Sequence, residues 1–361
     1  MHKNRGPIYY GDYLKLDALL GSQEPLSKKY SPECHDETLF IIVHQVYELW
    51  FKQILHELYL INKVFSQKVV PDQELASINL KLERVEKIQS LLLDQLLVIE
   101  TMTPMDFLEF RDLLVPASGF QSLQFRKIEV LMGLSTQNRT AVDRDYFMGR
   151  LSENDKKELL DIEDQPSLFV LLEKWLERLP FANVENYSFW SDYQTTINQM
   201  LKEDESLIMK NLATLGPKEK EAQLANLEAT KQTFATLSNE GEHNKLIEKG
   251  QRRLSHKATL HALFILLYRD EPMLQQPFNF LTHLMNIDEN FTTWRYRHSI
   301  MAQRMLGTKI GTGGSSGHQY LKMAAENNRV YNDLFNLATF LVPKSLLPEL
   351  PAEVAKKVRF N

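Results

Sequence analysis

The sequence predicts an all-α protein, and two observations support this. Apolar residues recur at three- and four-residue steps along most of the chain, which is the spacing of one face of an α-helix. The pattern is clearest over residues 36–65 and 72–102. In addition, no Asn-Gly or Asp-Gly pair joins two alternating runs, so the sequence gives no sign of a β-hairpin. We therefore expect a multi-helix bundle.

Composition excludes several classes of protein. The chain has 361 residues, of which 43% are hydrophobic and 25% charged, as in ordinary globular proteins. A net charge of -5 argues against a nucleic-acid partner, which usually requires a basic surplus. The sequence contains no run of 18 apolar residues, so we expect no membrane span. The first residues lack the apolar core of a signal peptide. The single cysteine, Cys34, excludes an internal disulfide, so we expect a cytoplasmic protein.

The first half of the chain divides into helices with clear boundaries. The segment 36–65 carries His44 on its apolar stripe, and 72–102 repeats the pattern. In the next segment Thr103 suits an N-cap, and Pro104 suits the first helical position. Pro116 ends that helix. Another helix is expected after Gly119, and it runs through Leu123 and Ile128.

The second half shows further helical patterns. We expect them at about 166–178, 187–211, 217–238, 254–269, 287–306 and 318–341. The stretch 202–250 differs from its neighbours because it is rich in Lys, Glu, Gln and Asn, which is typical of a solvated helical face. We expect residues 1–361 to form a single domain, with 202–250 as a charged helical hairpin inserted into it.

The helix that contains 294-WRYRHSIMAQRML-306 holds the most informative histidine. Trp294, His298, Met301, Ala302 and Met305 share one face of it. A histidine on an apolar face is often a hydrogen-bonded core residue. The alternative is a single axial ligand in a dry pocket, because the neighbouring methionines and tryptophan suit a large flat cofactor such as haem. A non-haem iron site would instead need two histidines and a carboxylate.

Two other residues leave a similar choice open. His44 lies within the apolar run 39-LFIIVHQVYELWF-51, as either a core histidine or a pocket histidine that bonds a ligand. Arg111 lies among aromatic and aliphatic residues. It either pairs with the neighbouring Glu109 or Asp112 or recognises a carboxylate in two-point fashion.

Five glycines gather in 307-GTKIGTGGSSGHQYL-321. A phosphate-binding loop would need a Gly-Lys pair after a strand, and the loop has neither. Ser315 fits the Gly-x-Ser-x-Gly spacing of a hydrolase nucleophile, but the strand that such a turn requires is missing. Two interpretations remain: a connecting loop without a function of its own, and a mobile loop that closes over a ligand.

Taken together, these segments resemble the tryptophan 2,3-dioxygenase family. The most specific blocks are 35-HDETLFIIVHQVYELWFKQILHEL-58, 100-ETMTPMDFLEFRDLLVPASGFQSLQFR-126 and 294-WRYRHSIMAQRMLGTKIGTGGSSGHQYL-321. Shorter matches lie at 9–20, 174–180, 188–193, 252–259 and 333–343. They follow the family's order over nearly the whole chain.

The resemblance implies an all-helical homotetramer that encloses a b-type haem, ferrous when active. Such an enzyme inserts both atoms of O2 across the indole C2–C3 bond of L-tryptophan. The product is N-formyl-L-kynurenine, in the first step of tryptophan catabolism by the kynurenine pathway. The alternatives are a related haem enzyme for another indole or aromatic amino acid, and a non-catalytic haem-binding sensor. A serine hydrolase using Ser315 is a more distant alternative.

The resemblance also implies roles for individual residues. His298 matches the proximal ligand of the haem iron, and we expect a second group to fix its other ring nitrogen. His44 matches the catalytic histidine that bonds the indole N–H, either as a base or only as a positioning group. Trp294 and Ser118 would contact the haem, and Arg111 would bind the substrate carboxylate. The remaining substrate contacts implied are Phe40, Ile41, Ile42, Val43, Phe107 and Thr312, with Tyr10 and Tyr13 reaching in from a neighbouring subunit.

Overall fold

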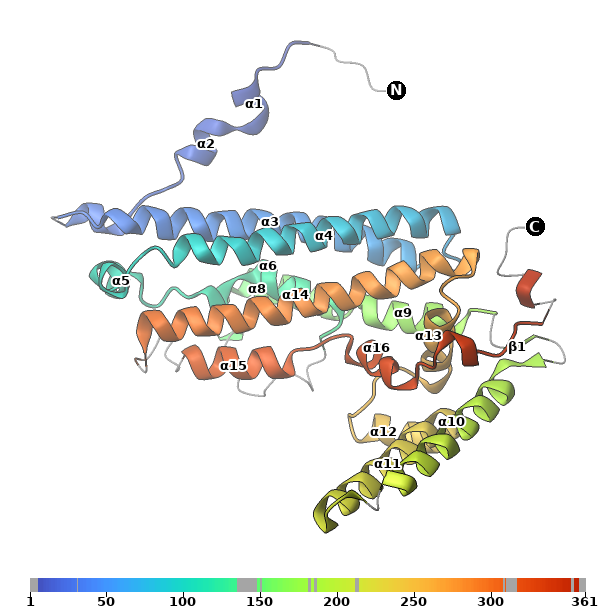
Figure 1. Cartoon of the computed structure of the whole chain (residues 1–361). Helices are drawn as coiled ribbons and strands as arrows, with labels where there is room; N and C mark the ends of the chain where they lie inside the picture. Colours follow the sequence, from blue (N-terminus) through green and yellow to red (C-terminus); the bar gives the residue numbers. More distant parts are fainter. Residues whose placement is uncertain are drawn as a thin grey trace.

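Three long helices form the body of the molecule in a computed structural model: α3 (His35–Phe65), α4 (Asp72–Ile99) and α14 (Gln275–Leu306). They lie side by side along its length (Figure 1). The structure describes residues 6–30, 32–134, 148–149, 151–180, 183–184, 187–211, 214–307, 309, 317–351 and 354–356. Within these ranges the only strands are the two-residue β1 (Asn183–Val184) and β2 (Tyr187–Ser188), which pair antiparallel. The predicted all-α fold is confirmed.

The predicted apolar stripes form the core between the long helices. On α3 the buried positions follow helical spacing through Val43, Tyr47, Phe51, Ile54 and Leu58. On α4 the whole predicted stripe is buried, namely Ile78, Leu82, Val85, Ile88, Leu92 and Leu96. Burying one continuous apolar face in this way is the main stabilising contribution to such a bundle.

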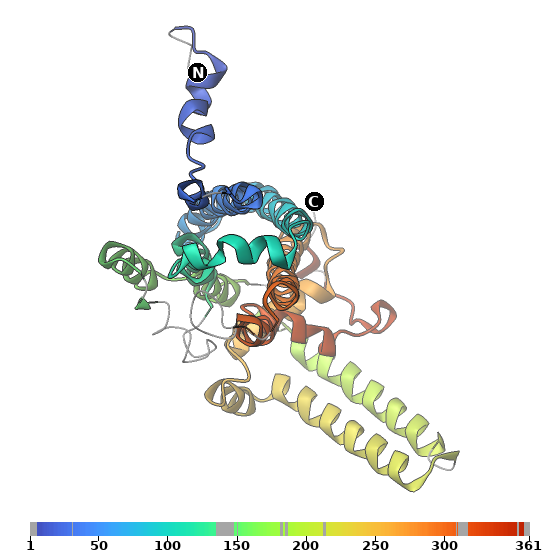
Figure 2. The same cartoon turned by 90° about the vertical axis from the view of Figure 1, so that its left-hand side faces the viewer.

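Shorter helices cover the two ends of this body (Figures 1 and 2). At the end where α14 finishes lie α5 (Pro104–Arg111) and α15 (Gly317–Asn327), while α6 (Leu123–Met132) packs against α3 toward the middle of the body. At the other end are α9 (Leu168–Glu177), α13 (His256–Leu267) and α16 (Asn332–Asn336). The helix α8 (Glu153–Glu163), which the sequence did not predict, packs against α6.

Two helix boundaries differ from the prediction. The helix α14 begins at Gln275 rather than near residue 287. Pro277 lies in its first turn, where the missing N–H has no helical acceptor to lose. The second difference concerns 318–341, which was expected to be one helix. It stops at Asn327 and resumes as α16 and a 3₁₀ turn, Leu337–Phe340.

Polar side chains on α14 account for the break after α15. The Asp288 carboxylate accepts the backbone N–H groups of Val330 and Tyr331 at 3.1 and 3.0 Å. Arg295 donates to the carbonyl of Asn328 at 2.9 Å. These buried bonds satisfy backbone groups that a continuous helix would have paired internally. The chain therefore turns at this point.

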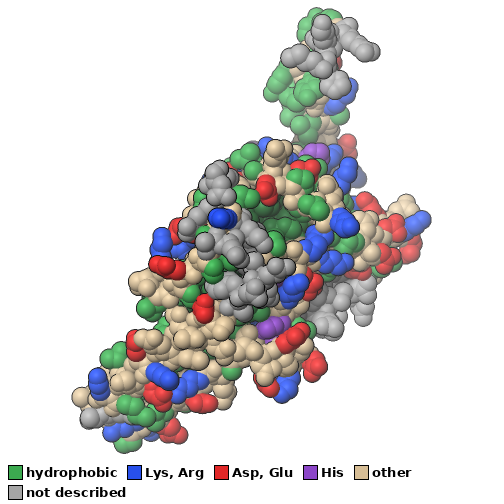
Figure 3. Space-filling model, turned by 90° about the vertical axis from the view of Figure 1, so that its right-hand side faces the viewer, with side chains coloured by type: hydrophobic (Ala, Val, Ile, Leu, Met, Phe, Trp, Pro, Cys, Tyr) green, Lys and Arg blue, Asp and Glu red, His purple; other side chains and the backbone are tan. Residues whose placement is uncertain are grey.

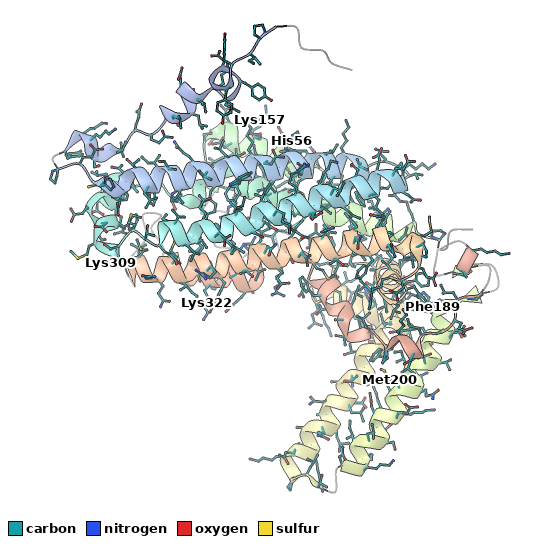
Figure 4. The ribbon with its side chains drawn as sticks, turned by 45° about the horizontal axis from the view of Figure 1, so that its top comes forward. His56, Lys157, Phe189, Met200, Lys309 and Lys322 are labelled. Carbon is teal, nitrogen blue, oxygen red and sulfur yellow. The ribbon has the colours of Figure 1, made fainter. Side chains whose placement is uncertain are left out.

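A helical hairpin leaves the body near α13. It consists of α10 (Phe189–Asn211) and α11 (Pro217–Ser238), and α12 (Glu240–Glu248) follows it. Figure 4 labels Phe189 at its base and Met200 farther along α10. Phe189 is fully buried, with its ring 5.1 Å from that of Phe264 on α13. Charged side chains of both signs lie on the projecting part, among polar and hydrophobic ones (Figure 3).

An N-terminal arm projects from the opposite side of the body (Figures 1 and 2). It contains α1 (Tyr10–Leu14) and α2 (Leu16–Leu20), neither of which buries a residue. Tyr10 and Tyr13 are 75% and 70% exposed. Across the part of the chain that the structure describes, no helix is both long and apolar enough to cross a membrane.

Candidate functional site

A cavity of about 280 Å³ lies inside the end of the bundle where α14 finishes. Side chains from α3, α4, α5, α6, α14 and α15 line it. The lining is mainly apolar and aromatic, with a few polar groups that converge on it, which is typical of a small-molecule or cofactor site. Lys309 and Lys322, labelled in Figure 4, lie outside the lining at the same end of the molecule.

The predicted face of α14 forms one wall. Trp294, His298, Met301, Ala302 and Met305 all line the cavity, because they recur at helical spacing along one side of the helix. The rings of Trp294 and His298 are 5.1 Å apart and inclined by 37°. The helix ends at Leu306, and the φ of 61° at the next residue, Gly307, is a backbone conformation that glycine adopts readily.

His298 is a neutral imidazole in this setting. Burial, together with repulsion from His44, lowers its pKa to about 4. Its Nδ1 atom is buried and has no hydrogen-bond partner among the described residues. The hydrogen-bonding group that we expected to fix the second ring nitrogen is therefore not found in that part of the chain. The ring of Trp294 packs beside the imidazole.

His44 faces the cavity from α3. Its Nδ1 lies 2.7 Å from the carbonyl oxygen of Phe40, one helical turn earlier. A carbonyl only accepts, so Nδ1 carries the proton and Nε2 of the neutral ring keeps its lone pair. Burial lowers the pKa of His44, while the Phe40 bond and Glu48 act in the opposite direction. The ring remains solvent-accessible because it faces the cavity.

Three phenylalanines form an aromatic wall beside His44. The ring of Phe40 lies 4.1 Å from the imidazole of His44 and stacks on Phe107 at 5.7 Å. Phe110 meets both of these phenylalanines edge to face, at 5.6 and 5.5 Å. Offset and edge-to-face contacts of this kind favour a well-defined ring arrangement. Phe40 and Phe107 line the cavity itself.

The short helix α5 brings Phe107 and Arg111 to the cavity. The two residues are four positions apart, so they share one face. A capping box starts the helix: the backbone N–H of Asp106 donates to the Thr103 hydroxyl at 3.3 Å, and the Thr103 N–H donates to the Asp106 carboxylate at 3.1 Å. Pro104 occupies the first turn, as the sequence predicted.

Arg111 lines the cavity with its side chain 15% exposed. Of the two carboxylates considered from the sequence, Asp112 lies 3.9 Å from its guanidinium and is itself 92% exposed. An ion pair that long, with so exposed a partner, contributes little. A guanidinium at the wall of an apolar cavity is suited to bind a carboxylate at two points.

Sequence reasoning missed a buried charged cluster at the inner end of the cavity. Arg126 and Arg295 both bond Glu129, at 2.9 and 2.8 Å, and all three line the cavity. Arg126 and Glu129 are three residues apart, so they lie on the same face of a helix, and this spacing could have indicated them. Tyr47 on α3 is a second missed lining residue.

Some of the predicted site residues do not meet in the cavity. Ile41, Ile42 and Val43 are absent from its lining, because only every third or fourth residue of α3 faces it. Val43 is buried on the side toward α4, where its carbonyl accepts from Gln95 at 2.7 Å. Ser118 does line the cavity. Tyr10 and Tyr13 lie on the projecting arm, and Thr312 lies outside the described residues.

The donor set of this site restricts which metal it could hold. Within the described ranges there is no group of three or more His, Cys, Asp or Glu side chains placed to bind an ion. A metal held there through one imidazole must therefore bring its other ligands with it, as the iron of haem does through the porphyrin. The neutral His298 ring and its apolar surroundings fit that requirement.

The chain is similar to known proteins over nearly its whole length. The model of the family described as tryptophan 2,3-dioxygenase matches residues 1–341. A protein of that name from Alteromonas mediterranea is 50% identical over 360 residues, covering 100% of this chain and 99% of its own. One from Bdellovibrio bacteriovorus is 49% identical over 98% of this chain and 99% of its own. One from Dictyostelium discoideum is 44% identical over 98% of this chain and 88% of its own.

Proposed function

The chain belongs to the tryptophan 2,3-dioxygenase family, and from this premise we infer its activity and the roles of the residues in the cavity. It is a haem-dependent oxidoreductase that inserts both atoms of O2 across the indole C2–C3 bond of L-tryptophan. The product is N-formyl-L-kynurenine, and the reaction opens the kynurenine pathway of tryptophan catabolism. The observation that carries the residue assignments is that one apolar cavity contains His298, His44 and Arg111 together.

We propose that His298 holds the haem iron. Its ring stays neutral, so a nitrogen lone pair is available to a metal. Met301 and Met305 on the same helix face, together with Trp294, offer an apolar surface to the macrocycle, and Ser118 also lines the cavity. When bound, ferrous haem supplies the one-electron chemistry that O2 requires and that no amino-acid side chain provides.

We propose that His44 positions the indole ring. Because its Nδ1 proton is directed at the Phe40 carbonyl, Nε2 is the nitrogen available to accept the indole N–H. The lowered pKa of His44 keeps the ring neutral near pH 7, and a protonated ring could not accept that bond. Phe40 and Phe107 supply aromatic surface beside it, which favours a flat apolar substrate.

Arg111 is proposed to bind the carboxylate of the amino acid. Its planar guanidinium can form two parallel bonds to a carboxylate, which fixes direction as well as position. With the indole held at His44 and the carboxylate at Arg111, the substrate has two anchors. Orientation of this kind accounts for a large part of many rate enhancements. Thr312 is proposed to contact the amino-acid end from the glycine-rich loop.

The decisive experiment is an anaerobic one. The haem-loaded protein is reduced without O2 and then mixed with O2 and L-tryptophan, and the absorbance of the formylated product is followed. We expect product to form in proportion to time and enzyme. A protein that binds haem but forms no product from L-tryptophan would support the sensor alternative. Turnover restricted to another indole would support the related-enzyme alternative.

We further propose a homotetramer in which the N-terminal arm completes a neighbour's site, and a cytoplasmic location. Support for the arm comes from Tyr9, Tyr10 and Tyr13, which are 76%, 75% and 70% exposed on an element that buries nothing of its own. Large exposed aromatic residues are typical of contact surfaces. Light scattering should give four chains per particle, and changing Tyr10 and Tyr13 to Ser should raise the KM for tryptophan.

A further inference from the structure

Tyr47 lines the cavity but has no role in the assignments above. It lies on α3, one helical turn after His44, and is 8% exposed. Its hydroxyl donates to the backbone carbonyl of Leu92 on α4 at 2.7 Å. The indole Nε1 of Trp294 on α14 lies 3.5 Å from the same oxygen and donates to it. One phenolic oxygen thus links three helices.

Trp294 in turn is the side chain that packs on His298. The two rings are 5.1 Å apart, and Phe125 supports Trp294 from α6 at 5.3 Å. Among the described residues no hydrogen bond holds Nδ1 of His298. The Trp294 ring is therefore one contact that restrains the rotation of the imidazole about its side-chain bonds.

The orientation of Trp294 depends on Tyr47. The phenol ring of Tyr47 also packs against the indole ring of Trp294, with the ring centroids 5.9 Å apart and the planes inclined by 64°. A Tyr47 hydroxyl that is fixed by the Leu92 carbonyl presents its lone pairs in a set direction, and that direction selects one orientation of the indole N–H. Without it, the N–H of Trp294 would lose this acceptor, and the indole could rotate.

We propose that Tyr47 is a positioning residue that sets the orientation of the His298 imidazole by anchoring Trp294 to the Leu92 carbonyl. The proposal rests on the proposed function, because it concerns the ring that would hold the haem iron. Its consequence is a definite strength and direction of the iron–histidine bond, since groups behind a metal ligand orient that ligand and tune the metal. In this role Tyr47 acts through Trp294.

The test is resonance Raman spectroscopy of the reduced, haem-loaded protein, read at the iron–histidine stretching band. Tyr47→Phe removes one oxygen and keeps the ring. We expect it to retain haem but to shift or broaden that band, and to speed the loss of haem to an excess of apomyoglobin. Tyr268→Phe is the matched control, because the Tyr268 hydroxyl also donates to a backbone carbonyl at 2.7 Å and the residue is 7% exposed, away from the cavity. It should leave the band unchanged.

A double variant separates this role from ordinary packing. If Tyr47 acts through Trp294, then Tyr47→Phe should cause no further shift in a Trp294→Phe protein. Additive shifts, or a wild-type band in Tyr47→Phe, would overturn the inference. Should Tyr47→Phe fail to fold, Trp294→Phe remains as a test. An unshifted band in that variant would overturn the inference, because Tyr47 is proposed to act through Trp294. A wild-type protein without any iron–histidine band would instead overturn the assignment of His298, and the inference with it.

Discussion

At the scale of single residues, His298 is the one on which the site depends. Its neutral ring is the only imidazole of α14 that lines the cavity, among the described residues. We expect His298→Ala to lose haem, because the substitution removes the ring nitrogen that is proposed to bind the iron. The measurement is haem absorbance per protein chain after purification. His283→Ala is the control, since His283 lies on the same helix but bonds Glu86 at 2.7 Å. Wild-type haem content in His298→Ala would refute the assignment.

Arg111 should determine how the enzyme distinguishes an amino acid from a bare indole. Removing one partner of a hydrogen-bonded charge pair costs about 2–5 kcal/mol. Arg111→Ala should therefore lower kcat/KM for L-tryptophan by about 30-fold or more, since each 1.4 kcal/mol is about tenfold. Tryptamine, which lacks the carboxylate, should be processed equally well by both proteins. Arg111→Lys keeps the charge and should lie in between. Equal losses for the two substrates would count against the clamp.

Protonation of His44 should cause the loss of activity at low pH. Because burial lowers the pKa of His44 from its ordinary value of 6.5, the ring keeps its acceptor nitrogen to a lower pH than an exposed histidine would. The acid decline of the kcat/KM profile should therefore lie at a lower pH than an exposed histidine would give. His44→Ala should keep haem, lack this decline, and react about 100-fold more slowly if the indole is misplaced. A decline that persists unchanged in His44→Ala would assign it to another group.

At the scale of elements, α5 shows how a short helix can control binding. Eight residues form little helix in isolation, so its capping box and packing must hold it. Loss of an N-cap hydroxyl costs about 0.5–2 kcal/mol. We expect Thr103→Ala to lower the free energy of unfolding by about that amount and to raise the KM for L-tryptophan, because α5 carries Phe107 and Arg111.

The neighbouring Thr101 supplies the control for this prediction. Its hydroxyl donates to the carbonyl of Val98 at 2.7 Å, at the end of α4, and caps no helix N-terminus. Thr101→Ala should leave the KM unchanged. Denaturant titration and steady-state kinetics of both variants are the measurements. If Thr103→Ala loses stability and keeps its KM, then α5 is held in place by packing and the cap has no influence on binding.

The long helices and the projecting hairpin differ in how much apolar surface they bury. The core of the body is one continuous apolar seam, whereas the α10–α11 hairpin buries only a thin stripe that includes Ile197, Leu201, Leu227 and Phe234. A charged, thinly packed hairpin anchored by Phe189 fits the proposal that 202–250 is an insertion within a single domain. That division of the chain stays a prediction.

At the scale of the whole molecule, buried histidines should make the fold sensitive to acid. His261 on α13 is 4% exposed, and burial, followed by repulsion from Lys257, lowers its pKa to about 4. Between pH 6.5 and 4 the unfolded chain binds a proton at this residue that the folded chain does not. The free energy of unfolding should therefore fall by about 1.4 kcal/mol per pH unit for each such histidine as the pH is lowered.

Equilibrium unfolding at several pH values tests this contribution. His261→Gln should reduce the slope of stability against pH between 6.5 and 4 by about 1.4 kcal/mol per unit. His56→Gln is the control, because His56 lies exposed on α3 and its ring meets water in both states (Figure 4). An unchanged slope in His261→Gln would show that another group is responsible. Because His261 lies outside the cavity lining, haem loading should not alter this result.

Local sequence was sufficient for most of the secondary structure. Apolar periodicity located α3 and α4, and the Thr103–Pro104–Asp106 pattern located the start of α5, because these signals lie within one or two turns of the residues they govern. The prediction of one helix over 318–341 was wrong because the signal that breaks it is not local in the sequence. The break depends on Asp288 and Arg295, which lie 43 and 33 residues before the backbone groups that they bind and become neighbours of them only when α14 packs.

The same distinction holds for the site. By itself, the sequence determined the all-α class, the family and the residue types that the chemistry needs, since residue identity and spacing within one helix fix these. Only the tertiary structure decided that Phe40 and His44 face the cavity while Ile41, Ile42 and Val43 do not. It alone showed that Tyr47, Trp294 and Leu92 meet at one oxygen atom. Such contacts join helices far apart in the chain, and packing sets their geometry.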